Sequence, residues 1–312
     1  ILTRATGEFD YSATLRIPFG NDLDISSLEA RSRLEGVIVD LPLPLGKSAN
    51  EARDFRYLNT FGDPVQRVEV DFGDDFRAIL VLNEAKLVAG SVNFGEGEAG
   101  EPKSSGVTVA GALDEVKLAQ WQSLTDDLQS KYLALSDVSL DAEMSRSVEL
   151  IDLEIGKLHA FGSELLDVSS QLRRGDRLWE IDIKNPILGG RFKVPDEGDQ
   201  PLIVDLDYIR IASDEDKGDK EDPLLQLEPE LLGALEFSTD SFSWDGEDYG
   251  SWSFVFTPTD DGALISSLSA EVKGLNIKST QDGEQSSINW IKTEQEHRSH
   301  FEGFLNSSDL AK

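Results

Sequence analysis

The sequence predicts a mainly β protein, built as a long curled antiparallel sheet or groove of repeated short strands with one or two amphipathic helices. Apolar and polar residues alternate with period two through much of the 312-residue chain. Asp-Gly pairs, which favour tight hairpin turns, separate several of the alternating stretches. Helical spacing of apolar residues is clear in one long segment alone.

The alternation is clearest in three segments, each of which predicts a half-buried antiparallel strand. Their apolar members, separated by charged residues, are Val68, Val70 and Phe72; Trp179, Ile181 and Ile183; and Val204, Leu206 and Tyr208. Similar patterns predict strands at 9–17, 76–82, 87–94, 106–113, 138–144, 148–158, 165–172, 231–243, 252–257, 264–272, 275–279 and 287–292. Turns are expected at Phe72-Gly73-Asp74, Asp245-Gly246, Asp261-Gly262 and Asp282-Gly283.

One amphipathic helix is predicted over residues 113–133, with Asp114 as its N-cap. A shorter helix at 41–53 is an alternative to extended structure, which Pro42 and Pro44 favour before Gly46. The polar stretch 214–222 predicts a loop between two strands. The apolar residues at helical spacing in the long segment are Val116, Leu118, Trp121, Leu124, Leu128 and Tyr132.

The composition excludes several classes of function. The formal net charge is 29 − 60 = −31, so the basic patches that bind nucleic acid or an anionic bilayer surface are missing. The excess of Asp and Glu predicts a solvated acidic surface. The chain has no Cys, which excludes disulfides and thiolate metal sites. No window holds 18 consecutive apolar residues, and the sequence begins with Ile1 rather than Met. We therefore expect a processed soluble segment whose membrane anchor lies outside it.

Motifs that would indicate an enzyme are weak, so we expect neither catalysis, a metal nor a cofactor. His297 and His300 would need His159 or nearby carboxylates to bind zinc, and the acidic pair Asp245 and Glu247 is typical of a charged surface. Residues 214–222 lack the ligand spacing of a calcium loop, and no phosphate-binding loop is present. An alternative function is sugar binding on a β-sandwich, with stacking on Trp244, Tyr249 and Trp252, or a scaffold role for such a sandwich.

Several phrases, taken in order, resemble the AsmA-like family of large periplasmic proteins of the YhdP type. The most specific is residues 34–47, LEGVIVDLPLPLGK, which is similar to the family phrase L-x-G-V-x-x-D-L-P-x-P-L-x-K. Residues 106–114 leading to Trp121, and residues 179–195, WEIDIKNPILGGRFKVP, also resemble family phrases. Further matches lie at 206–211, at Asp222-Pro223, and from Trp290 to residues 301–305, so that the resemblance covers nearly the whole chain.

The resemblance implies a C-terminal portion of a protein that one N-terminal helix anchors in the inner membrane of a Gram-negative bacterium. Its β-rich body would cross the periplasm and carry phospholipid towards the outer membrane in a hydrophobic groove. The implied partners are phospholipid acyl chains, the inner membrane through an anchor outside this chain, and outer-membrane proteins. The whole chain, 1–312, would be one such segment, with sub-units 1–134 and 135–312 as a further expectation.

An antiparallel sheet that curls without closing has one apolar face on which acyl chains can lie. A groove of this kind needs length and alternation rather than catalytic residues. The alternative is that the same side chains form the closed core of a β-sandwich, covered at one end by the helix. The candidate lining residues are Val68, Val70, Phe72, Ile79, Val81, Val92, Phe94, Ile181, Ile183, Phe192, Leu206, Phe254 and Phe256.

Overall fold

The computed structural model contains two compact units, Ile1–Arg174 and Gly175–Lys312. The structure describes residues 4–19, 25–61, 64–84, 86–103, 105–133, 148–160, 162–198, 200–212, 233–278, 285–292 and 297–307. The predicted strand at 138–144, the loop at 214–222 and the turn at Asp282-Gly283 lie outside these ranges. The expected sub-units met at 134/135, whereas the two strands after the helix belong to the first unit.

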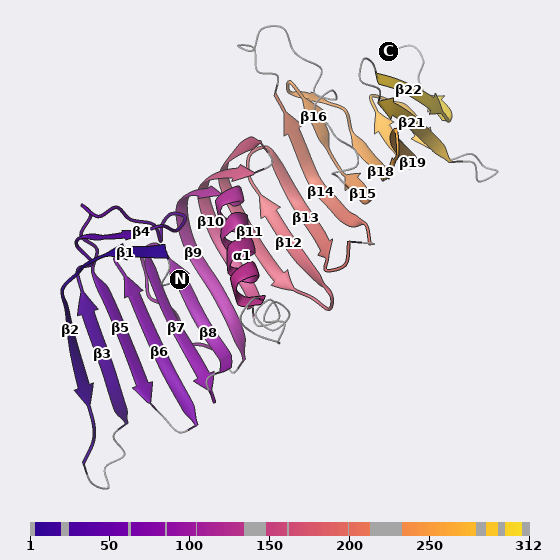
Figure 1. The fold of residues 1–312 in the computed structure, drawn as a ribbon. Helices are drawn as coiled ribbons and strands as arrows, with labels where there is room; N and C mark the ends of the chain where they lie inside the picture. The colour runs from indigo at the N-terminus through magenta and orange to yellow at the C-terminus, as the bar shows by residue number, and fades with distance from the viewer. Residues whose placement is uncertain are drawn as a thin grey trace. The chain divides into compact units, whose positions relative to one another are not determined.

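The first unit is one large sheet whose strands follow one another in space in chain order (Figure 1). Alternating side chains form both of its faces, as the period-two pattern predicts. The strands are β2 (Tyr11–Arg16), β3 (Ser26–Ser32), β5 (Phe55–Phe61), β6 (Val65–Phe72), β7 (Phe76–Asn83), β8 (Lys86–Phe94), β9 (Gly106–Lys117), β10 (Val148–Ala160) and β11 (Ser163–Arg174).

Two neighbouring junctions of this sheet are parallel, unlike the predicted antiparallel arrangement. β9 pairs parallel with β8 and again parallel with β10. A parallel junction needs a connection that returns along the sheet, and between β9 and β10 this connection contains α1 (Leu118–Leu133). The remaining pairings of the sheet are antiparallel, as predicted.

The helix begins later than its apolar pattern predicts. Asp114, the expected N-cap, lies inside β9, which continues to Lys117. Cross-strand pairing explains the difference, since Glu115 and Lys117 still pair with β10. The helix therefore starts directly after the last residue of the strand. No second helix forms at 41–53, where the described backbone is extended or turned.

A small two-stranded element, here called the cross-piece, consists of β1 (Ala5–Gly7), β4 (Val37–Val39) and the chain up to Lys47. Val39 and Lys47 exchange two backbone hydrogen bonds of 2.9 and 3.0 Å. The Lys47 side chain is buried, and its Nζ donates to the carbonyl oxygens of Leu34, Val37 and Ser48. These bonds satisfy all three protons of a buried ammonium, so the cross-piece has a well-defined conformation.

The second unit is also a sheet, in which one long strand has two short strands, one after the other, along one of its sides. β12 (Leu178–Lys184), β13 (Leu188–Pro195) and β14 (Leu202–Ile211) are antiparallel, whereas β14 pairs parallel with both β15 (Leu235–Thr239) and β16 (Phe242–Trp244). The Asp245-Gly246 turn has positive φ at both residues and joins β16 to β17 (Glu247–Asp248), as the turn chemistry predicts.

At the far end of this unit, two short strands again lie one after the other beside a longer one. β18 (Ser251–Thr259) pairs with β15 and with β19 (Gly262–Val272), which in turn pairs with β20 (Leu275–Lys278) and β21 (Ser286–Lys292). β22 (His297–Glu302) lies beside β21, and β23 (Phe304–Ser307) lies beside β20. The buried Ser286 hydroxyl of β21 connects these strands, because it donates to the Lys278 carbonyl of β20 and accepts from the Phe304 N–H of β23.

Replacement of Gly111 by Ala should destabilise the first unit by about 2 kcal/mol or more. Gly111 in β9 has a φ of +129°, and an added Cβ would lie 2.0 Å from the Phe94 carbonyl oxygen of β8. Urea unfolding of the purified chain measures the effect. The control is Gly198→Ala, where nothing lies within 4 Å of the added atom and a change of about 0.5 kcal/mol or less is expected. Equal stability of both variants would contradict the parallel β8–β9 contact.

Candidate functional site

The sheet of the first unit has one apolar and one polar face, which the strand register assigns without ambiguity. Residues directly opposite each other on paired strands point to the same side. One such row runs from Leu28 through Asn59, Val68 and Leu80 to Gly90. A second, two residues along, contains Ala30, Tyr57, Val70, Ala78, Val92 and Val109, and a third contains Ser32, Phe55, Phe72, Phe76, Phe94 and Gly111.

Five of the predicted lining residues of this unit lie on the apolar face, and two do not. Ile79 and Val81 pair with Glu69 and Arg67 and point to the polar face. The strand β7 contains the uninterrupted apolar run Ala78–Val81, so alternation alone does not select its face. The three-residue turn after Phe72 does, because it places Phe76 opposite Phe72. The five on the apolar face are Val68, Val70, Phe72, Val92 and Phe94.

Pattern reasoning missed several members of this face. The register places Leu80 and Ala78 on it, but their neighbours in the sequence are also apolar, so alternation does not show which face they take. Leu28 and Tyr57 lie in strands of mixed composition, where polar residues on both sides weaken the alternation. The three-residue turn between β6 and β7 is the signal that identifies Leu80 and Ala78, because it carries the face of the well-defined strand β6 to β7. Leu28 and Tyr57 follow only from the pairing of β3, β5 and β6.

In the second unit, all six predicted lining residues share one face. Ile181 pairs with Phe192. Ile183 pairs with Gly190, which pairs in turn with Leu206, so these side chains point to the same side of the sheet. Phe254 pairs with Phe237, and their rings stack with centroids 4.9 Å apart. Phe256 belongs to a buried cluster with Ala263 and Trp290. The face thus contains Ile181, Ile183, Phe192, Leu206, Phe254 and Phe256.

The degree of cover differs among these thirteen residues. Phe72, Phe94, Leu206 and Phe256 are at most 8% exposed, as core residues are. The other nine are half-buried. In the part of the chain that the structure describes, the elements over the apolar face of the first unit are α1 and the cross-piece (Figure 1).

Two contacts locate these covering elements. Trp121 of α1 meets Phe94 edge to face, with ring centroids 6.4 Å apart. Arg53 lies over the ring of Phe72 at 4.8 Å and donates to the Pro44 carbonyl beside the cross-piece. Across strands β2 to β7 several apolar side chains keep contact with solvent: Tyr11 and Leu15 of β2 are 70% and 60% exposed, and Val68, Val70 and Leu80 of β6 and β7 are half-buried. We call this stretch the open part of the apolar face.

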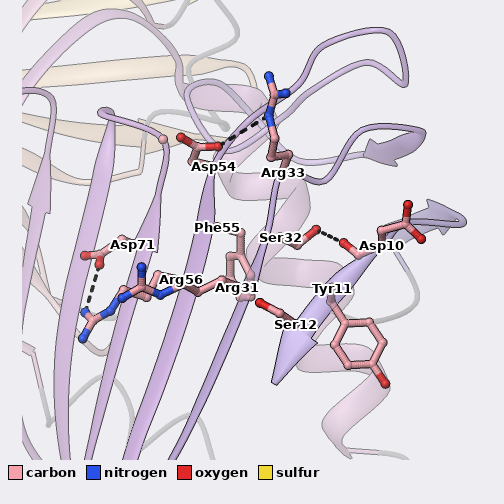
Figure 2. Close-up of a pocket in the computed structure, with 11 residues that line it drawn as sticks. Asp10, Tyr11, Ser12, Arg31, Ser32, Arg33, Asp54, Phe55, Arg56 and Asp71 are labelled. Atoms are coloured by element: carbon pink, nitrogen blue, oxygen red, sulfur yellow. Dashed lines mark hydrogen bonds and ion pairs between the residues drawn. The ribbon is translucent and has the colours of Figure 1, made fainter. Parts of the chain in front are cut away.

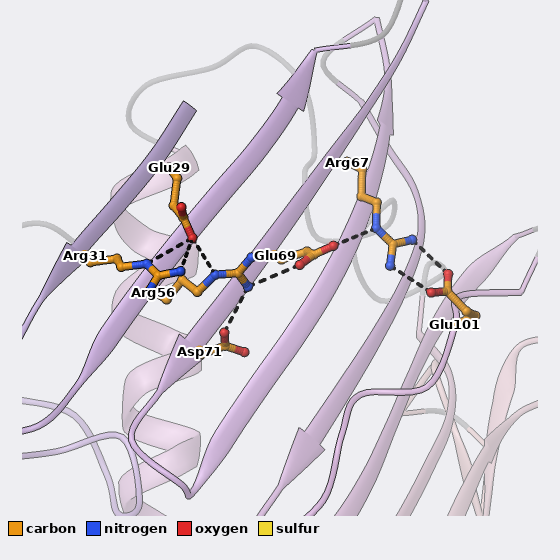
Figure 3. A network of polar contacts seen from close by, with 7 residues as sticks. All are labelled: Glu29, Arg31, Arg56, Arg67, Glu69, Asp71 and Glu101. Carbon is orange, nitrogen blue, oxygen red and sulfur yellow. Dashed lines mark hydrogen bonds and ion pairs between the residues drawn. The ribbon is translucent and has the colours of Figure 1, made fainter. Parts of the chain in front are cut away.

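The polar face carries a chain of ion pairs across three strands (Figure 3). Glu29 of β3 accepts hydrogen bonds from Arg31 and from Arg56 of β5, and Arg56 also donates to Glu69 and Asp71 of β6 at 3.3 and 3.2 Å. The bonds from Arg56 and Arg31 lower the pKa of Glu29 below its ordinary value of 4.5. The face therefore carries mutually neutralised charges, and its apolar members Ile79 and Val81 stand opposite charged residues of β6.

The connection between β8 and β9 is attached to the same polar face. Arg67 of β6 forms a bidentate pair with Glu101, with two N···O distances of 2.8 and 2.9 Å, and also contacts Glu69. Arg77 of β7 donates to the Gly97 carbonyl. The bond from Arg67 lowers the pKa of Glu101. The two connections next to β9 thus lie on opposite faces, since α1 covers the apolar one.

A polar pocket of about 600 Å³ lies at the end of β2, β3, β5 and β6 (Figure 2). Its charged groups already have partners, because Arg33 approaches Asp54 at 3.9 Å and Arg56 contacts Asp71 at 3.2 Å. The Ser32 hydroxyl donates to the Asp10 carbonyl at 2.7 Å. With each arginine next to a carboxylate, the pocket has no excess charge to attract an ionic ligand.

The aromatic residues considered for sugar binding are engaged in other contacts. Tyr249 packs against Phe242 and has the ammonium of Lys273 over its ring at 4.6 Å. The Trp252 indole N–H donates to the Tyr249 carbonyl at 2.9 Å, and Trp252 lies on the apolar face of its unit. Among the described residues, no group of three or more His, Asp and Glu side chains has the arrangement of a metal site.

The fold and this surface define a class of protein: a β-sheet protein in which, among the described residues, part of an apolar face has no covering layer. The family model described as YhdP protein matches residues 1–312, and the chain belongs to that family. Members are generally envelope-associated, non-enzymatic and linked to lipid transport. No curated protein and no solved structure matches the chain. None of the described helices is long and apolar enough to cross a membrane.

Replacing Arg56 by Met should lower the free energy of unfolding at pH 7 by about 1 kcal/mol, because three carboxylates on neighbouring strands lose their shared cation. The loss should shrink below pH 4.5. The lowered pKa of Glu29 in the folded state contributes stability above its unfolded pKa, and this contribution disappears as the pH falls and the carboxylate is protonated. Urea unfolding at a series of pH values measures the difference.

The matched control is Arg33→Met. Arg33 is 73% exposed at its side chain, and its ion-pair distance to Asp54 is 3.9 Å, so its replacement should change stability by about 0.5 kcal/mol or less. An Arg56→Met effect that is the same at pH 7 and pH 3 would show that packing of the arginine stem, rather than its charge, provides the stabilisation.

Proposed function

We propose that the open part of the apolar face binds phospholipid acyl chains and lets them move along the sheet. The observation that supports this most directly is the register, which places half-buried Val68, Val70 and Leu80 in adjoining rows on one face. The ion pairs on the opposite face make it unsuited to the same role. Membership of a family linked to lipid transport supports the same conclusion.

The energetics of such a surface favour transport over tight storage. Each methylene that leaves water for an apolar contact gains about 0.8 kcal/mol, so a chain that is shielded on one side gains part of that amount per carbon. Aliphatic side chains line the face on β6 and β7, and aromatic ones on β5, and the aliphatic side chains make no directional bond that would select one position of the acyl chain. The headgroup stays in water at the rim of the sheet. An acyl chain can therefore shift from one row to the next at little cost.

In this proposal the chain is a segment of a periplasmic protein that supports phospholipid movement between the inner and outer membranes and the barrier function of the outer membrane. The acidic surface, with a net charge of −31, disfavours adsorption of the segment to anionic headgroups along its length. Lipid would then be held by its acyl chains, so the proposed partner is apolar and the proposed role needs neither a metal nor a cofactor.

Adjacent residues of β7 provide a matched test of the face. Leu80→Glu puts a carboxylate on the apolar face, whereas Ile79→Glu puts the same group on the polar face. Both side chains are half-buried in the native sheet. Native mass spectrometry with lipid extraction, on protein purified without detergent, should show phospholipid on the wild type and on Ile79→Glu, and at least about fivefold less on Leu80→Glu, because a charge on the path is poorly solvated there.

Thermal unfolding of both variants is the control for folding. Loss of lipid from both, with unchanged stability, would mean that the lipid does not follow the apolar face. A wild-type protein free of lipid under conditions in which it is folded would remove the proposal for this segment.

A further inference from the structure

We propose that α1 is a lid over the β8–β10 part of the apolar face, and that the ion pair between Arg4 and Asp127 is the latch that holds it. The inference rests on the proposed function, because a lid matters only if acyl chains use this face. It adds a specific control point to the surface described above.

The position of α1 follows from the topology. A connection between two parallel neighbours must return over one face of the sheet, and for β9 and β10 it returns over the apolar face, as the Trp121–Phe94 contact shows (Figure 1). The helix therefore occupies the space that an acyl chain would need in order to continue from the open part across β8, β9 and β10. Ile155 of β10, on the same face, is 7% exposed.

The attachment of the helix is suited to movement. The first residue of α1, Leu118, follows Lys117 of β9 without a loop, so that the junction is a hinge at the end of a paired strand. Trp121 and Leu124 pack near this hinge. Beyond them, the Asp127 carboxylate meets the Arg4 guanidinium at 2.7 Å. An apolar surface and the Arg4–Asp127 ion pair therefore hold the described part of the helix in place at successive turns.

The latch connects the lid to the cross-piece rather than to the large sheet. Arg4 immediately precedes β1, its carbonyl accepts from Asp40 N–H at 2.8 Å, and Asp40 follows β4. The side chains of Arg4 and Asp127 are 24% and 30% exposed, so the pair is partly shielded from solvent and from screening ions. Because the cross-piece has its own buried anchor at Lys47, it provides a firm second point of attachment for the helix.

These observations give the lid two states. In the closed state the apolar side of α1 shields the β8–β10 part of the face, and in the open state acyl chains take its place. Opening also exposes the apolar side of α1, including Trp121 and Leu124, so the closed state is favoured without lipid, and the partly buried Arg4–Asp127 pair adds to its stability. Removing the latch should raise the population of the open state about fivefold, equivalent to about 1 kcal/mol.

The first test uses lipid uptake. Vesicles of phosphatidylcholine carry a quenched fluorescent phosphatidylethanolamine, and transfer to the protein is followed by recovery of fluorescence. Arg4→Ala and Asp127→Asn should each accelerate uptake about fivefold over the wild type, and the exchange Arg4→Asp with Asp127→Arg should return it towards the wild-type rate. Arg33→Ala, which removes an exposed arginine paired with Asp54, is the charge control and should change nothing.

A locked form tests the opposite direction. The chain contains no Cys, so Arg4→Cys with Asp127→Cys introduces the only two thiols. Joined by a short bifunctional methanethiosulfonate, this variant should lose uptake across the covered part, and reduction should restore uptake to at least the wild-type rate. Uptake by the wild type that neither latch removal nor cross-linking changes would overturn the lid while leaving the proposed function intact.

A second readout needs no lipid. Ile155→Cys, beneath the closed lid, should react with a maleimide about fivefold faster when Arg4→Ala is added, whereas Leu15→Cys on the open part should react at an unchanged rate. An equal rate at position 155 in both backgrounds would show that α1 is a fixed cover and overturn the proposal. If the wild type takes up no lipid at all, the proposed function fails, and the lid for acyl chains fails with it.

Discussion

The structure depends on one constraint: a β-sheet with period-two alternation has an apolar face that must be shielded from water. Most β proteins meet it by packing a second layer on that face. In the first unit the described residues meet it only in part, through one helix at β8–β10 and a short cross-piece near Phe72. The remaining shielding comes from side chains in neighbouring rows, which is why Val68 and Val70 are half-buried rather than buried. An open apolar face and its partial cover are two results of this one requirement.

The polar face makes this arrangement tolerable for stability. A sheet without a second layer has little buried core, so its strands need other cross-strand interactions. Arg56 provides them by joining three strands, and Arg67 extends the chain of ion pairs to the connection at Glu101. Paired charges on one side and apolar rows on the other give the sheet two surfaces with different tasks. Although the whole chain has an excess of acidic residues, arginines therefore balance the carboxylates on these neighbouring strands.

Much of the fold could be predicted because local pattern and turn chemistry agree. Strand β6 alternates strictly, and the Asp245-Gly246 turn has the conformation that its residues favour. What could not be predicted depends on partners far away in sequence. The strand β9 extends through Asp114 because β10, which follows 30 residues later in the chain, pairs with it. Ile79 was assigned to the wrong face for a related reason: a continuous apolar run contains no information about register, which a turn supplies. The Arg4–Asp127 contact has no local signal at all.

The two connections around β9 have a consequence for chirality. β8, β9 and β10 are parallel neighbours in spatial order, and the chain passes from β8 to β9 over the polar face but from β9 to β10 over the apolar face. Two crossovers that advance in the same direction on opposite faces have opposite hands, so one of them is left-handed, the form that β-sheet proteins almost always avoid. The bidentate bond of Arg67 to Glu101 and the bond of Arg77 to Gly97 hold the non-helical one. This part of the sheet therefore relies on side chains for a handedness that backbone twist alone would not produce.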